Sequence, residues 1–116
     1  MKHHSKIRKL GRTRNVRRAL IRSLAEALII SGKIKTTEAK AKELRPFIEK
    51  LLTKAKKGDL SAQRLIISRL GGEKQSFKLI QEIAPKYADR DGGYTRVIKL
   101  PARGGDGSSM AIIEFV

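Results

Sequence analysis

The sequence predicts an α+β fold in which a helix, a strand, three helices and two strands follow one another along the chain. Over most of residues 13–84 the apolar residues recur every three or four positions, which is the period of an amphipathic helix. Residues 94–100 alternate instead, and residues 110–116 form a second β-branched run. We expect the last two segments to pair antiparallel, in a small sheet that is mostly antiparallel or mixed.

The first helix should begin after Thr13, a suitable N-cap, and end before Gly32, a typical residue to follow a helix. One side of it carries apolar residues four positions apart: Val16, Leu20 and Leu24. Another side, about 200° away, carries arginines at the same spacing: Arg14, Arg18 and Arg22. From residue 24 to residue 30 apolar residues surround the axis, so we expect burial of this half on most sides.

Residues 33–37 are short, β-branched and preceded by glycine, which predicts a strand. Ile34 makes this strand a candidate third member of the sheet. The second helix should cover residues 38–57 and end at Gly58. Pro46 lies inside it and cannot donate the usual main-chain hydrogen bond, so we expect a kink or a break there.

Asp59 should cap the third helix, which ends at two consecutive glycines, residues 71–72. We expect a fourth helix over about residues 74–84, limited by Pro85. Its predicted inward residues are Phe77, Ile80 and Ala84.

Basic residues are concentrated at the start of the chain. Nine of the 27 Lys and Arg residues lie in residues 1–22, and the first acid is Glu26. After Met1, only Ile7 and Leu10 are apolar before Gly11, so we predict an extended basic arm over residues 1–12. Residues 13–116 should form one domain, and we expect this domain to bind RNA. Such a concentration of like charge implies an anionic partner.

Composition restricts the class of protein further. The chain has a formal net charge of +16 and no cysteine, which excludes disulfides and fits a reducing cytoplasm. We expect neither a secretory signal nor a membrane span, because no sufficiently long apolar run is present. Aromatic residues make up only 4% of the chain, which favours recognition of phosphate and shape over stacking on bases.

The arginines of the first helix are the strongest candidates for phosphate contact, although a charged helix face can also be simply solvated. A second basic ridge is formed by Lys50, Lys54 and Lys57. These lysines could contact phosphate, but they are equally well explained by the helix dipole, which favours cations near a helix C-terminus. His3 and His4 have no third ligand for a metal, so we expect hydrogen bonds to phosphate instead.

No arrangement of residues predicts catalysis. Asp89 and Asp91 fit turn chemistry, and the glycine-rich residues 104–107 lack the following helix of a phosphate-binding loop. Tyr94 follows two glycines and fits two interpretations, a core position or a contact with ribose or phosphate.

Several segments together resemble the family of bacterial large-subunit ribosomal protein seventeen. They are Ile34-Lys35-Thr36-Thr37, Lys40-Ala41-Lys42-Glu43-Leu44-Arg45, Ala84-Pro85-Lys86-Tyr87, Gly92-Gly93-Tyr94-Thr95-Arg96, Gly105-Asp106-Gly107 and residues 110–116. Where the family carries Asn-Arg and His-Arg pairs, this chain has Gly11-Arg12 and Val16-Arg17, which retain the arginines.

The resemblance implies a non-catalytic, cytoplasmic protein of the large ribosomal subunit, with ribosomal RNA and neighbouring ribosomal proteins as partners. It implies no cofactor, metal, membrane or small-molecule substrate. The residues expected to contact RNA are Lys2, His3, His4, Lys6, Arg8, Lys9, Arg12, Arg14, Arg17, Arg18, Arg22, Lys35, Thr36, Thr37, Lys40, Lys42, Arg45, Tyr94, Arg96 and Arg103. The alternative is an architectural or transcription protein that binds DNA, which should read bases with Asn or Gln among its arginines.

Overall fold

A computed structural model describes residues 13–116 of the chain. The predicted arm over residues 1–12, with seven of the expected RNA contacts, lies outside the described residues. The helices are α1 (Arg14–Ser31), α2 (Glu38–Lys57), α3 (Leu60–Leu70) and α4 (Glu73–Lys78). The strands are β1 (Lys33–Thr37), β2 (Thr95–Leu100) and β3 (Met110–Phe115). The α+β prediction and its order of elements are therefore confirmed.

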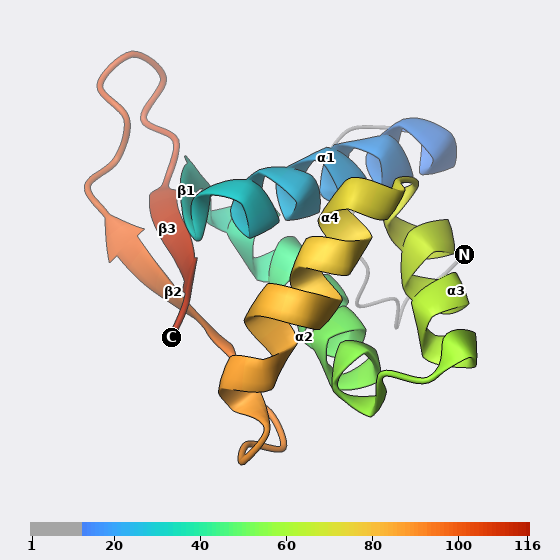
Figure 1. Ribbon diagram of the computed structural model, residues 1–116. Coiled ribbons are helices and arrows are strands. Elements are labelled where there is room, and N and C mark those ends of the chain that lie inside the picture. Colours follow the sequence, from blue (N-terminus) through green and yellow to red (C-terminus); the bar gives the residue numbers. More distant parts are fainter. Residues whose placement is uncertain (1–12) are drawn as a thin grey trace, which may run out of the picture.

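The three strands form one antiparallel sheet in the order β1-β3-β2, so the strand containing Ile34 does join the other two. Figure 1 shows the helices gathered on one side of this sheet, with the β2–β3 loop projecting beyond it. Ile34, Ile113 and Val97 lie opposite one another in register and face the helical core. The next row, formed by Lys33, Glu114 and Arg96, lies on the outer face because side chains alternate along a strand.

Helix α2 forms the centre of the core, contacting both the other helices and the sheet. Its buried residues follow the helical period: Ala41, Leu44, Ile48, Leu51, Leu52 and Ala55. The helix is continuous across Pro46, which excludes the break that was one of the two predicted outcomes. Burial of Leu44 and Ile48 on either side of Pro46 compensates for the missing hydrogen bond.

The inward side of α1 differs from the predicted apolar row. Its buried residues are Ile21, Ala25, Leu28 and Ile29, whereas Val16 is 53% exposed. Burial of residues 24–30 on most sides is confirmed except at Ile30, which is 57% exposed. The physical reason is that the first turn of α1 extends past the core, whereas Ile21 and the residues after it pack against other elements.

Of the predicted inward residues of the fourth helix, Ala84 is buried and Ile80 packs against the core, but Phe77 departs. Phe77 is 38% exposed, while Leu79 and Ile83 are buried in its place. After α4 the chain continues as a π-helical turn, Leu79–Ile83, and a 3₁₀ turn, Ala84–Tyr87. A π-helical turn is wider than an α-helical one, so it shifts the positions that face the core. Pro85 does not end the helical region, because it lies near the start of the 3₁₀ turn, where no main-chain donor is required.

Candidate nucleic-acid interface

A cleft of about 630 Å³ lies between α1, α2 and α3. Among residues 13–116, five basic side chains line it, three from α1, one from α2 and one from α3: Arg17, Arg18, Arg22, Lys50 and Arg69. Glu43 is the one acid that the described part of the chain contributes to the lining, and Ile21, Pro46, Phe47 and Leu51 are among its apolar residues. We call this feature the cationic cleft. Its charge and its helical walls suit a phosphate-bearing chain.

The arginines of the cationic cleft are not equivalent. Arg22 donates a hydrogen bond from Nε to the main-chain carbonyl oxygen of Arg69 at 3.1 Å. Its guanidinium also lies against Gly71, where a Cβ atom would be only 3.0 Å from Nη1 of Arg22. Arg18 is exposed, and it has no carboxylate partner within residues 13–116. Arg18 is therefore available to an anion, while Arg22 is partly engaged in holding the end of α3.

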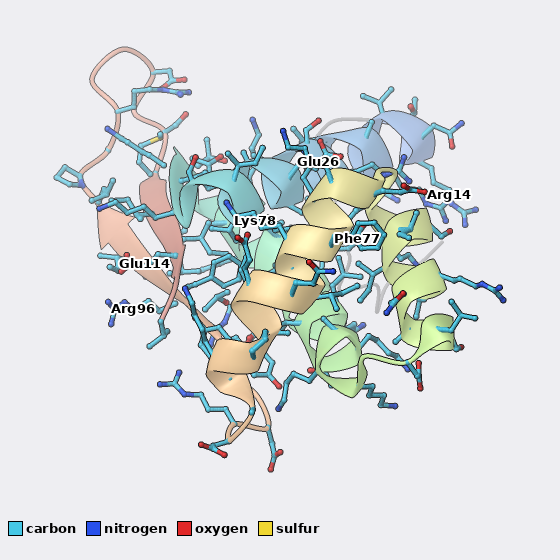
Figure 2. All side chains as sticks on the ribbon, in the orientation of Figure 1. Arg14, Glu26, Phe77, Lys78, Arg96 and Glu114 are labelled. Carbon is cyan, nitrogen blue, oxygen red and sulfur yellow. The ribbon has the colours of Figure 1, made fainter. Side chains whose placement is uncertain are left out.

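Arg14 is exposed but does not line the cationic cleft. Figure 2 shows it projecting from the first turn of α1, at the end of the molecule opposite the sheet. The arginine row predicted from the sequence is thus present along α1, and its last two members reach the cationic cleft.

Three other predicted RNA contacts are paired with acids. Lys42 bridges Glu38 at 2.7 Å, Arg96 bridges Glu114 at 2.8 Å on the outer sheet face (Figure 2), and Arg103 pairs with Asp106 at 2.6 Å. The hydrogen bond from Lys42 holds the pKa of Glu38 below its ordinary value. The structure does not bring these residues to the cationic cleft, nor does it bring Lys35, Thr36, Thr37, Lys40 or Arg45 there. Thr36 is itself buried in the sheet.

Tyr94 is a core residue, which is the first of its two predicted interpretations. Its side chain is 0% exposed and packs edge-on against Tyr87, with ring centroids 5.4 Å apart. Its hydroxyl donates to the carbonyl of Arg90 at 3.3 Å and accepts from Lys56 at 3.2 Å. A group so enclosed has no free surface to offer to a ribose or a phosphate.

Lys50 and Arg69 were not predicted as contacts, although both line the cationic cleft. Lys50 lies on the basic ridge near the C-terminus of α2, where the helix dipole explains a cation as well as a phosphate contact does. Arg69 lies in the last turn of α3, where a cation is also common. No local signal links either residue to the arginines of α1, because their proximity arises from the packing of three helices.

Two further features concern the part of the chain that the structure describes. Residues 13–116 hold no group of three or more His, Cys, Asp or Glu side chains arranged to bind a metal ion. In the same range, no helix is both long enough and apolar enough to cross a membrane.

The fold and the cationic cleft define a small, strongly basic α+β protein with a surface suited to a polyanion. The sequence profile of the family described as Ribosomal protein L17 matches residues 20–116. The chain belongs to the ribosomal protein L17 family, which confirms the resemblance noted from the sequence.

Three relatives illustrate the similarity, and each is named Large ribosomal subunit protein bL17. The one from Campylobacter lari is 53% identical over 116 residues, covering 100% of this chain and 99% of its own. The one from Campylobacter jejuni subsp. jejuni is 52% identical with the same coverage. The one from Campylobacter fetus subsp. fetus is 50% identical, covering 100% of this chain and 98% of its own.

Proposed function

We propose that this protein is a structural constituent of the large ribosomal subunit in the cytoplasm, where it binds large-subunit ribosomal RNA and contacts neighbouring ribosomal proteins. The names of its relatives support a place in the large ribosomal subunit, and the net charge of +16 supports RNA as its partner. The protein has no catalytic role in this proposal. It acts by neutralising phosphates that would otherwise repel one another when RNA helices pack.

The cationic cleft is the observation that carries the proposal. Arg17, Arg18 and Lys50 come from two helices and converge on one concavity, where their fields add. Residues 1–12 add five Lys or Arg residues and two histidines, and we assign them to the same RNA. Thr36 and Tyr94 are left out of the proposed interface because both are buried.

Sedimentation of a cell lysate through a sucrose gradient tests this assignment. We expect the protein to travel with the large subunit at physiological salt, and to dissociate only when high salt weakens its phosphate contacts. Recovery in the free protein fractions, or with chromosomal DNA, would contradict the proposal.

A further inference from the structure

A second cleft, of about 400 Å³, adjoins the cationic cleft across α2 and lies within the range of about 300–1,000 Å³ found for small-ligand sites. Lys50, Leu51 and Arg69 line both clefts, so the two share a wall. The surface that lines this second cleft is mostly apolar, whereas the surface that lines the cationic cleft is mostly polar. A chain of phosphates held in the first cleft would therefore pass the mouth of a site with a different chemistry.

The charges of the second cleft also differ from those of the first. Asp91 and Glu49 contribute two carboxylates beside three cations, so the excess of positive charge is much smaller. Glu49 is already engaged, since both its oxygens accept the main-chain N–H of Tyr94, at 2.9 and 3.1 Å. Asp91 is exposed and has no hydrogen bond or ion pair with any other residue of 13–116. The Asp91 carboxylate is therefore available to accept hydrogen bonds from a ligand.

The loop that carries Asp91 is anchored on both sides. The carbonyl of Arg90 accepts hydrogen bonds from the Lys56 ammonium and from the Tyr94 hydroxyl. The Arg90 guanidinium donates to the carbonyl of Gly93 at 3.3 Å, which closes the loop on itself. Asp91 and Gly92 are therefore held at the edge of the cleft before any ligand arrives, which lowers the entropic cost of binding.

We propose that the second cleft receives one unpaired guanine of the RNA whose backbone lies in the cationic cleft. This inference rests on the proposed function and names a nucleotide site within it. An unpaired base can leave its stack and enter a protein pocket, where its Watson–Crick edge is read by hydrogen bonds. Guanine is the base whose edge presents two adjacent donors, N1–H and N2–H, and a carboxylate accepts both. Leu51, Leu65 and the methylene stem of Lys54 provide the apolar walls.

The test compares Asp91→Asn with the matched control Asp89→Asn, bound to protein-free large-subunit ribosomal RNA from the cells that make the protein. Both aspartates are exposed in the same loop, and only Asp91 lines the cleft. The probe is kethoxal, which reacts with N1 and N2 of guanines that are not paired. We expect the wild type and Asp89→Asn to protect one guanine that becomes reactive in Asp91→Asn, with an affinity loss of about tenfold.

The outcomes separate this inference from the function on which it rests. If Asp91→Asn binds the RNA with the same salt dependence as the wild type and protects the same guanines from kethoxal, the proposed guanine site is wrong and the RNA-binding function stands. If Asp89→Asn exposes the same guanine, the loop and not the Asp91 carboxylate is responsible, and the inference is again wrong. If the wild type forms no complex with the RNA, both proposals fail.

Discussion

Arg22 donates a hydrogen bond from Nε to the main-chain carbonyl oxygen of Arg69, 3.1 Å away and 47 residues along the chain. The acceptor lies in the last turn of α3, where carbonyl oxygens have no partner within the helix and the helix dipole favours a cation. Lys78 does the same for α1, donating to the carbonyl of Ile30 at 3.1 Å. Part of the positive charge of this protein therefore stabilises its own helices instead of facing a ligand.

Arg22 and Arg18 should separate in their effects on stability. Arg22→Gln should lower the free energy of unfolding by about 0.5–1 kcal/mol, because it removes the interaction with the end of α3. Arg18→Gln removes the same charge from the same helix and should leave stability unchanged. Denaturant titration of the two variants measures the difference, and equal losses would show that the contact with Arg69 contributes nothing.

The loss of stability caused by replacing Gly71 should depend on the presence of Arg22. Gly71 has φ of +78° and Gly58 has φ of +66°, so Ala at either position should cost about 1 kcal/mol for a left-handed backbone. A Cβ at Gly71 would also displace the Arg22 guanidinium, whereas one at Gly58 would have no atom within 4 Å. We expect Gly71→Ala to cost more than Gly58→Ala in the wild type, and the excess to vanish in an Arg22→Gln background. An excess that persisted there would mean that Gly71 is crowded by something other than Arg22.

The cationic cleft should account for much of the salt dependence of RNA binding. Replacing Arg17, Arg18 and Lys50 together by Gln should reduce the slope of log affinity against log salt by about 2 to 3, at roughly 0.7–0.9 per phosphate contact. The matched control removes three exposed cations elsewhere, at Lys57, Arg64 and Lys86. Affinity measurements over a salt series compare the two triple variants. Equal slopes would show that only total charge matters.

Tyr94→Phe should weaken the fold and leave the phosphate contacts of the RNA complex in place. The lost hydroxyl bonds to Arg90, Thr53 and Lys56 in the protein interior, so we expect a loss of about 1–2 kcal/mol in the free energy of unfolding. The salt slope of RNA binding should be unchanged at a temperature where the variant is folded, because the enclosed hydroxyl contacts no phosphate. A variant with native stability and a reduced salt slope would return Tyr94 to the interface.

The ion pair between Arg103 and Asp106 in the β2–β3 loop should persist at mildly acidic pH. Hydrogen bonds from the Arg103 guanidinium, at 3.0 and 2.6 Å, and from the Ser108 amide, at 3.1 Å, hold the pKa of Asp106 far below its ordinary value. A lowered pKa adds stability above the unfolded-state pKa, and this is lost only as the pH falls through the folded-state pKa. NMR titration should therefore show no change in Asp106 between pH 7 and about pH 4. In Arg103→Gln its midpoint should rise, and a wild-type midpoint at the ordinary value would contradict the pairing.

The fold class and nearly all the element boundaries could be predicted from the sequence because they depend on local chemistry. Gly32 adopts a left-handed backbone conformation at the end of α1, and the side chains of Thr37 and Asp59 accept main-chain hydrogen bonds at the start of α2 and α3. The exposed arginine row of α1 follows from the helical period in the same way. Each of these features involves residues within one or two turns of one another.

Only the tertiary structure decided how these elements combine. The cationic cleft joins residues of α1 to Arg69, and the guanidinium of Arg22 turns toward α3 because three helices pack together there. Burial of Ile21 in place of Val16 follows from which turns of α1 touch the core. The π-helical turn at residues 79–83 likewise places Leu79 inward in place of Phe77. Such outcomes depend on contacts between segments distant in sequence, and the local periodicity of a single segment carries no information about them.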